Sequence, residues 1–572
     1  MSRFGFVLGA AEPAFEARLA ALESARFPAR LWSRDAALWG DAPERVRVAS
    51  NRLGWLEVAR RMQGEVGALE AFADEVARDG YTTAVLLGMG GSSLAPEVMR
   101  RTYGVRPGRL DLTVLDNTSP AAVEAVHRAH DPKTTLFLVS SKSGSTIEVS
   151  CFERSFREAV AKARPDPGRS FVAITDPGSP LETSAREHGY RRVFLNPADI
   201  GGRYSALSYF GLVPAALIGA DLGALLASAA RHADASGPQV PAGENAPVAL
   251  GAALGELARA GRDKLTLVLG EEIAALGSWI EQLVAESSGK DGRGIVPVVD
   301  EALGAPESYG ADRVFVAISA RPLSSAVDAR LTALRDAGHP VLRWTLRDLS
   351  ELGGEFLGWE IATAVACATI DVDPFDEPNV TEAKNATRAA LDRWLERGRF
   401  ELPAPIAAAG EVEARVSDAL ARALEPDVPA DPWSALAATA AQSRAGDYLA
   451  LLAYLHPTEG IRSRLERLRH ALRERTRCAT TLGIGPRYLH STGQLHKGGP
   501  DEGLFVMLTA SEGDRPIPGE RWGFGTLQAA QALGDAQALE TRGRRVLRLH
   551  LGAAPEPALD RLIEAVAARA RA

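Results

Sequence analysis

The hydroxyl-rich segment SSKSGST, residues 140–146, has the clearest potential for chemistry in this sequence. It follows the apolar run TTLFLVS (134–140) and precedes a helical pattern, so hydroxyls and helix-start N–H groups would converge on one point. Lys142 adds a positive charge there. This combination suits a phosphate monoester. The alternative is a Ser/Thr N-cap in a flexible loop.

Two glycine-rich segments would bring the backbone close to a ligand. GMGGSSLAP (88–96) leads from a strand pattern into a helix, where its glycines permit a tight turn and Ser92 can donate to an anion. It lacks the GxGxxG spacing of a dinucleotide site, and a structural turn is the alternative. GGRYS (201–205) places Arg203 after two glycines, with a fork of donors for an oxyanion. For Arg203, a surface ion pair is the alternative.

A helical pattern from Ala274 to Glu286 carries a candidate general base. Gln282 and Glu286 are four residues apart and share one helix face beside apolar residues. The carboxylate would lie at the helix C-terminus, where the dipole raises its basicity. A solvated glutamate at a helix end is the alternative.

Two later loops contain potential proton carriers. DPFDEPNVTEAK (373–384) ends in Lys384, and PRYLHSTGQLHKGG (486–499) contains His490, His496 and Lys497. For each loop, an ordinary turn is the alternative.

Short apolar runs separated by helix-length segments must position these residues. One series lies at 82–88, 110–116, 134–140 and 169–175, and a second at 264–270, 312–319 and 339–346. This spacing predicts βαβ units, hence an α/β protein with two domains whose parallel sheets are covered on both faces. Two later strands, at 503–510 and 544–551, either complete the second sheet or form a small third unit.

Composition changes divide the chain into four regions. Residues 1–75 predict a helical arm, 76–235 a first α/β domain and 248–400 a second one. The Pro- and Gly-rich stretch SGPQVPAGENAP (236–247) predicts a linker or exposed loop between these domains. Residues 355–475 look mainly helical, with breaks at 403–410 and 426–432. Region 401–572 is therefore expected to hold a helical segment and a C-terminal α/β part that bears the His490 loop.

The overall composition excludes several classes of protein. The 572 residues are 46% hydrophobic and 24% charged, as in folded globular proteins. Lys and Arg are scattered among acids, with a net charge of −8, so nucleic-acid binding is not expected. Three widely separated cysteines favour a reducing compartment without structural zinc. A poor secretory signal and no membrane-length apolar run predict a cytoplasmic protein without membrane contact.

Together these segments resemble glucose-6-phosphate isomerase. In order, GMGGSSLAP resembles the family's GxGGSxLGP, SKSGST its SKTxTT phosphate loop, IGGRYS its GGR[YF]S and QLVAESSGK its QxxxE-S-x-GK. DPFDEPNVTEAK resembles the NPFxQPGVExxK of shorter bacterial isomerases, with Glu377 where Gln is usual, and YLHSTGQ resembles their LHSxGQ.

The order of the last motifs departs from the family. Its His segment closely follows the Glu segment and precedes the Lys segment, whereas here the order is Glu286, Lys384, His490. This order resembles the isomerase half of transaldolase–isomerase fusions, whose tails carry a run like GPRYLHSTGQLHKGGP (485–500). Because the isomerase segments begin by residue 88, isomerase activity alone is expected.

The resemblance implies two sugar-isomerase (SIS)-type doubly wound domains. It also implies a glycolytic and gluconeogenic enzyme that interconverts glucose 6-phosphate and fructose 6-phosphate through an enediolate, as a homodimer without cofactor or metal. Glu286 would be the base between C2 and C1, Arg203 would stabilise the enediolate, and His490 and Lys384 would open the ring. The implied contacts to phosphate and sugar come from Ser92, Ser141, Lys142, Ser143, Thr146, Gly202 and Gln282.

Two other functions are considered. A catalytically silent module that binds sugar phosphates would keep the phosphate loop, but the joint presence of Glu286, Arg203, Lys384 and His490 argues against it. An isomerase that also accepts mannose 6-phosphate would differ at pocket residues that the sequence does not identify. His496 and Lys497 compete with His490 for ring opening, and His490 is ranked first.

Overall fold

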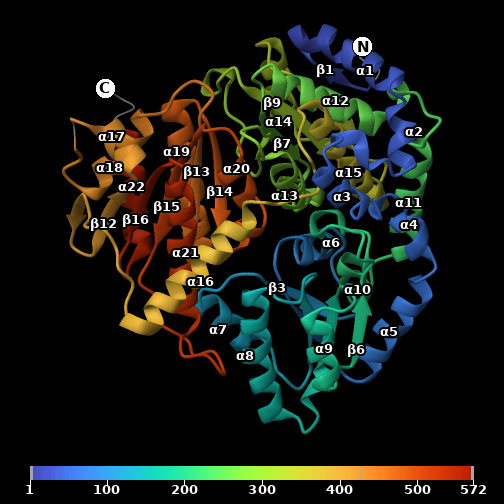
Figure 1. Ribbon diagram of the computed structural model, residues 1–572, viewed down its shortest axis with the longest axis horizontal. Coiled ribbons are helices and arrows are strands. Elements are labelled where there is room, and N and C mark those ends of the chain that lie inside the picture. The colour runs from blue at the N-terminus through green and yellow to red at the C-terminus, as the bar shows by residue number, and fades with distance from the viewer. Residues whose placement is uncertain (1–3, 427, 569–572) are drawn as a thin grey trace.

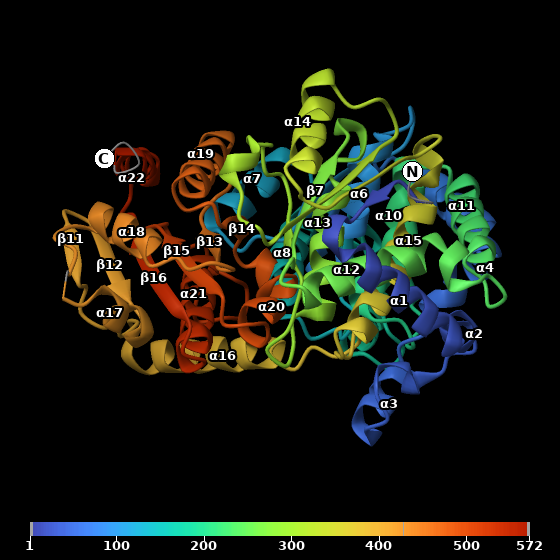
Figure 2. The same cartoon turned by 90° about the horizontal axis from the view of Figure 1, so that it is seen from above.

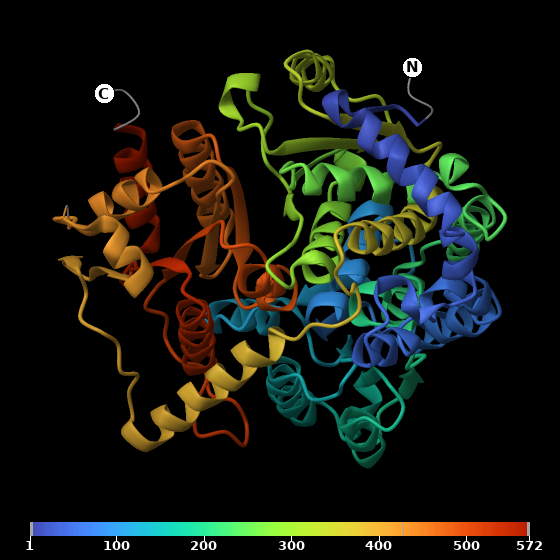
Figure 3. The same cartoon turned by 45° about the horizontal axis from the view of Figure 1, so that its top comes forward.

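The computed structural model describes residues 4–426 and 428–568, and these form three α/β units, each built on its own sheet (Figure 1). We call them the first, second and third units in chain order of their main strands. Figure 3 shows the N-terminal helices, in blue, along the outer side of the first two units. Among the described residues, no helix is both long and apolar enough to cross a bilayer.

The first unit contains an all-parallel sheet in the order β3-β2-β4-β5-β6. Its strands are β2 (Thr83–Gly88), β3 (Asp111–Leu115), β4 (Thr135–Ser140), β5 (Phe171–Thr175) and β6 (Arg192–Leu195). β4 and β5 are buried along their whole length, as continuous apolar runs in a covered parallel sheet should be. Four of these strands were predicted. β6 was missed because it is short and partly exposed, with an arginine at its start.

The helices of the first unit follow its strands. They are α6 (Leu94–Tyr103), α7 (Pro120–Ala129), α8 (Ile147–Ala163), α9 (Pro180–Glu187) and α10 (Tyr209–Ile218). The chain passes from β2 outward to β3 and then returns to β4 on the other side of β2. Ligands of such sheets bind where the strand order reverses, outside the carboxyl ends of the strands. The glycine turn after β2 and the hydroxyl loop after β4 lie at this reversal.

The second unit has the sheet order β1-β10-β9-β7-β8. Its strands are β1 (Phe6–Val7), β7 (Lys264–Leu269), β8 (Val296–Val298), β9 (Arg313–Ser319) and β10 (Val341–Thr345). Its helices are α12 (Ala246–Arg259), α13 (Leu276–Ser288), α14 (Ser325–Asp336) and α15 (Leu352–Thr369). All neighbouring pairs are parallel except β1 with β10. The expectation of a purely helical arm is therefore wrong at Phe6–Val7, where the open edge of β10 offers unpaired backbone groups.

The rest of the N-terminal region is helical. It contains α1 (Glu12–Ser24), α2 (Phe27–Trp32), α3 (Pro43–Ser50), α4 (Trp55–Gln63) and α5 (Val66–Arg78). α1 packs on α12, and α4 packs on α11 (Leu222–Ala235). The segment 236–247, expected to be a linker or exposed loop, is partly buried beside them. Trp32 Nε1 donates to the Ser236 carbonyl at 2.6 Å, and the buried Asn245 side chain caps α12.

The third unit contains a six-stranded sheet in the order β11-β12-β16-β15-β13-β14. Its strands are β11 (Ala407–Ala409), β12 (Val412–Val416), β13 (Tyr448–Tyr454), β14 (Ala479–Ile484), β15 (Gly503–Thr509) and β16 (Arg545–His550). The four strands β16, β15, β13 and β14 are parallel, and β12 pairs antiparallel on both sides. Of the two placements left open for the late strands, the structure has the separate unit.

The prediction that residues 355–475 are mainly helical agrees with α15, α16 (Val380–Arg397), α18 (Pro432–Ala441) and α19 (Glu459–Thr476). β11 lies in the expected break at 403–410, but the prediction misses β12 and β13. β13 is the central buried strand YLALLAY, and periodicity cannot distinguish a short apolar run in a strand from one in a buried helix. It is flanked by α18 and α19.

Helix α16 leads from the second unit to the third. Figure 2 shows it along α21 (Phe524–Thr541), and the two helices pack together. The third unit also projects the short helix α20 (Gly493–Gly498) against α13, and the turn at Arg487–His490 against the glycine turn of the first unit. The His490 loop therefore reaches both other units.

Candidate active site

The glycine turn after β2 is the meeting point of three segments. A Cβ atom on Gly90, whose φ is +53°, would lie 2.5 Å from the His490 carbonyl oxygen and 2.9 Å from Gln282 Nε2. A Cβ atom on Gly91 would lie 2.1 Å from the Gly202 carbonyl oxygen. Side chains at these two positions would separate the segments, so the glycines permit the site to close.

Glu286 lies at the end of α13 and is hydrogen-bonded at both carboxylate oxygens. Oε1 accepts from Arg203 Nη1 at 3.0 Å, and Oε2 accepts from Gln282 Nε2 at 3.0 Å. The same Gln282 nitrogen donates to the His490 carbonyl at 2.8 Å. Gln282 and Glu286 share a helix face, as predicted, and one amide joins Glu286 to the His490 loop.

The environment of Glu286 favours its protonated form. Its residue exposure is 8%, and this burial is the largest cause of its raised pKa. The Arg203 guanidinium opposes the shift, and the carboxylate of Glu377 adds to it. Glu286 is thus a buried, desolvated carboxylate rather than a solvated one at a helix end.

Arg203 is buried, with 3% exposure, so the alternative of a surface ion pair does not apply. Besides Glu286, its guanidinium binds Glu377 Oε2 at 3.1 Å and the carbonyls of Pro374 and Asp376 at 2.6 and 3.0 Å. It therefore holds the 373–384 loop against the end of α13.

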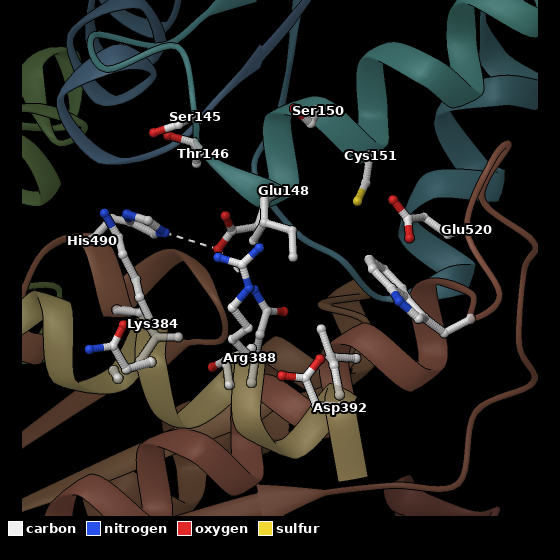
Figure 4. A pocket seen from close by; sticks show the side chains of 18 of the residues that line it. Ser145, Thr146, Glu148, Ser150, Cys151, Lys384, Arg388, Asp392, His490 and Glu520 are labelled. Atoms are coloured by element: carbon white, nitrogen blue, oxygen red, sulfur yellow. Dashed lines mark hydrogen bonds and ion pairs between the residues drawn. The ribbon is translucent and has the colours of Figure 1, made fainter. Parts of the chain in front are cut away.

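His490 pairs with a carboxylate that the sequence reasoning did not single out. His490 Nε2 lies 3.0 Å from Glu148 Oε1, which also accepts from Gln531 Nε2 at 2.8 Å (Figure 4). Burial raises the pKa of Glu148, but the charge and hydrogen bond of His490, with a contribution from Lys384, outweigh it and the pKa is lowered. The position of Glu148 in the first turn of the helix after the hydroxyl loop was a usable signal.

A cavity of about 600 Å³ opens beside this pair. Its wall includes Thr146, Glu148, Lys384 and His490, drawn from the first unit, α16 and the third unit (Figure 4). Glu286 and Arg203 are not in that wall. They form the buried polar cluster next to it, which Gln282 connects to His490.

The hydroxyl loop is internally hydrogen-bonded. Ser141 Oγ lies 3.0 Å from Thr146 Oγ1 and accepts from the Gly144 N–H at 3.1 Å, while Ser143 Oγ accepts from Ser145. The adjacent β4 residue Ser140 donates to the Ser92 carbonyl at 3.0 Å, so Ser92 lies directly beneath the loop. The predicted hydroxyls are thus brought together.

Lys142 is turned away from the loop hydroxyls. Its ammonium forms an ion pair with Asp176, the residue that follows β5. Sequence reasoning placed this charge among the hydroxyls because it could not include a partner from the neighbouring strand end.

His496 and Lys497, the two competitors of His490, lie in the interior of the third unit. His496 is 2% exposed among Tyr448, Tyr488 and Phe505, and burial moves its pKa well below the ordinary value. Lys497 Nζ pairs with Asp535 at 2.5 Å. Neither lines the cavity.

Lys290 is a further residue that the sequence reasoning missed. The Lys290 ammonium donates to the backbone carbonyl and the carboxylate of Asp376, at 2.7 and 2.8 Å. It therefore helps Arg203, which donates to the same Asp376 carbonyl, to fix the 373–384 loop. Its place in the QLVAESSGK segment was the available signal. Within the described residues, no three His, Cys, Asp or Glu side chains group as a metal site requires.

Comparison with known proteins gives the family. The phosphoglucose isomerase family model matches residues 69–300, which include Arg203 and Glu286 but not Lys384 or His490. A glucose-6-phosphate isomerase of Rubrobacter xylanophilus is 31% identical over 394 residues, which are 59% of this chain and 89% of the relative. The chain belongs to the phosphoglucose isomerase family.

Solved structures agree at the level of the fold. A hypothetical protein from Thermus thermophilus aligns with a TM-score of 0.57 at 25% identity, over 68% of this chain and 99% of that one. A glucose-6-phosphate isomerase from Chlamydia trachomatis aligns with a TM-score of 0.51 at 22% identity, over 65% and 78%. The predicted α/β class is confirmed, with sheets in the first two units whose strands are parallel except for β1.

Proposed function

We propose that this chain is a glucose-6-phosphate isomerase, which interconverts glucose 6-phosphate and fructose 6-phosphate through an enediolate without a metal ion. Family membership and the names of the relatives support the reaction. The observation that carries the mechanism is the Gln282 amide, which binds both Glu286 and the His490 loop. This amide connects the base to the loop that carries the imidazole, which supports the proposal that the two act on one substrate.

The first step is opening of the sugar ring. His490 lines the cavity and is oriented by Glu148, so its imidazole can transfer a proton between the anomeric hydroxyl and the ring oxygen. Lys384 lies in the same wall and supplies a positive charge beside the pair.

The second step is proton transfer between C2 and C1. Glu286 removes the proton from one carbon and returns it to the other, and its raised pKa suits a general base that must also act as an acid. Arg203 Nη1 is 3.0 Å from the Glu286 carboxylate. When Glu286 takes up the proton and becomes neutral, the charge of Arg203 is available for the oxyanion that forms at that moment.

The phosphate would rest on the hydroxyl loop at the N-terminus of α8. Ser141, Ser143 and Thr146 supply donors around an anion, and the helix end adds backbone N–H groups. Gln282 Oε1 is buried without a hydrogen-bond partner among the described residues, which makes it a ready acceptor for a sugar hydroxyl. Gly202 contributes to the site through its close backbone contact with Gly91 of the glycine turn.

The third unit has a defined task in this proposal, because residues 401–572 deliver His490. His490 shares one cavity wall with Glu148 and Lys384 of the same chain.

A coupled assay with fructose 6-phosphate tests the function. Wild-type protein should turn over with and without a chelator, and Glu286→Gln should lower kcat by about 10²- to 10⁴-fold, the usual contribution of a general base. Glu271→Gln, which removes an exposed carboxylate shortly before the same helix, is the control and should keep its activity. An inactive wild type, or unchanged turnover in Glu286→Gln, would contradict the proposal.

A further inference from the structure

The third unit has a cavity of its own, of about 430 Å³, outside the carboxyl ends of its parallel strands. Tyr454, Thr509 and His550, which end β13, β15 and β16, all line it. The chain passes from β13 to β14 on one side and returns to β15 on the other, so the strand order reverses between β13 and β15. This is where open α/β sheets bind ligands.

The cavity is separate from the candidate active site, and α21 forms the wall between them. Gln531 on α21 lines the first cavity, whereas Gln528 and Ala532 line the second. Neither Glu286 nor His490 reaches the second cavity.

Two arginines face each other across neighbouring strands in this cavity. Arg415 of β12 and Arg548 of β16 are directly opposite in the sheet register, and both line the cavity. Like charges in directly opposed positions destabilise a sheet unless something lies between them. Arg415 is paired with Glu413 at 2.7 Å and donates to the Pro403 carbonyl at 2.7 Å.

The guanidinium of Arg548 makes no hydrogen bond or ion pair within the part of the chain that the structure describes, although its backbone belongs to the sheet. It is half-buried, and its pKa is lowered by burial, partly offset by Glu540 and reinforced by Arg415. A desolvated guanidinium with free donors is a binding group for a planar or tetrahedral anion.

An unpartnered amide points to the same ligand. Gln528 is 6% exposed, and its Nε2 has no hydrogen-bond partner among the described residues, although it lines the cavity. A buried donor without a partner is costly, so a ligand acceptor is expected there. Two carboxylates also lie in the wall. Glu413 is paired with Arg415, and Glu512 accepts from Ser119 Oγ and from the His456 N–H, so Arg548 is the cation of the wall without an anionic partner among the described residues.

We infer that this cavity binds a second small molecule, the phosphate monoester of a small polyol, with its phosphate between Arg415 and Arg548 and its hydroxyls on Gln528 and Glu512. The phosphate relieves the opposition of the two arginines, and the polyol satisfies the free amide. The size of the cavity accommodates such a molecule beside the apolar side chains of Phe400 and Leu533.

Isothermal titration calorimetry on the full chain with glycerol 3-phosphate tests this inference. Wild-type protein should bind the probe, and Arg548→Met should weaken the affinity at least about tenfold, the effect of losing one charge-assisted hydrogen bond. Arg467→Met, which removes an exposed arginine of the same unit, is the matched control and should bind as the wild type does.

Gln528→Leu provides a second variant that keeps the shape of the wall and should also weaken binding. No binding by the wild type, or equal affinity in both variants and the control, would overturn the inference. The fructose 6-phosphate assay is independent of this result. A chain without isomerase activity that still bound glycerol 3-phosphate through Arg548 would reject the proposed function and retain the second site.

Discussion

His490 and Glu148 are 342 positions apart in the sequence, yet their side chains are hydrogen-bonded at 3.0 Å. The carboxylate comes from the first turn of α8 in the first unit, and the imidazole comes from a loop of the third unit. Gln531 holds the same carboxylate oxygen from α21. Glu148 is therefore the group that fixes the orientation of His490 against the first unit.

This pair predicts a specific defect in ring opening. His490→Ala should lower the turnover of cyclic glucose 6-phosphate by about 10²- to 10⁴-fold and the turnover of an open-chain analogue much less. The reason is that the imidazole transfers a proton only during opening of the ring. Glu148→Gln should show the same selectivity with a smaller loss. Ser150→Ala, two residues further along the same helix and in the same cavity wall, is the control. Equal slowing of cyclic and open-chain substrates would remove His490 from ring opening.

Glu377 predicts a shift in the pH profile. Its negative charge raises the pKa of Glu286, so Glu377→Gln should lower that pKa. The base would then be ionised at lower pH, and the acidic limb of kcat/KM should move down by a few tenths to about one pH unit. As the control, Glu382→Gln removes a partly exposed carboxylate that pairs with Arg542. It should leave the acidic limb of kcat/KM at the wild-type pH. A limb that moves upward or stays fixed in Glu377→Gln would contradict this electrostatic coupling.

The hydroxyl loop predicts a loss that is selective for the phosphate. In a Glu286→Gln background, which prevents turnover, replacing Ser141, Ser143 and Thr146 with alanine should weaken glucose 6-phosphate binding by at least about 10²-fold. Binding of free glucose should change little. Lys142→Met should weaken glucose 6-phosphate binding less than the triple substitution does, because the Lys142 ammonium is already paired with Asp176. Equal losses for phosphorylated and free sugar would mean that the loop does not bind phosphate.

The buried Lys497–Asp535 pair predicts a large effect on stability. Asp535 is fully buried, pairs with Lys497 at 2.5 Å and accepts from Tyr488 at 2.6 Å. Asp535→Asn leaves the buried ammonium uncompensated and should lower the free energy of unfolding by about 3–5 kcal/mol, measured by urea denaturation. Asp560→Asn breaks only the partly exposed ion pairs with Arg464 and Arg467, and should cost about 1 kcal/mol or less. Similar losses in the two variants would contradict this ranking.

The fold was predictable where strands of a covered parallel sheet appear as short apolar runs bounded by Gly, Pro, Ser or Asp. The strands at Thr83–Gly88, Thr135–Ser140 and Arg313–Ser319 follow this pattern. β13 was not predictable in this way because its seven apolar residues fit a buried helix equally well. β1 depends on an edge that only tertiary structure creates.

The candidate site was predictable where its groups share one element or one motif. Gln282 and Glu286 are on one helix face, and the loop hydroxyls are consecutive. Pairings between distant elements were not predictable. Lys142 pairs with Asp176 from the next strand, and Glu148 pairs with a histidine from another unit.

The separate hydrophobic core of the third unit has a consequence for inactivation. One face of its sheet, which carries Leu449 and Leu547, buries a core formed by this unit alone, whereas the other face shares a core with Ala285, Val296 and Val298 of the second unit. Once the contacts of that shared face are lost, this unit has the means to unfold locally while the first two sheets persist. Each such opening would withdraw the imidazole and leave Glu286 and Arg203 in place. Mild heat or denaturant should then abolish turnover before most of the secondary structure melts, and recovery on cooling would report the refolding of the third unit alone.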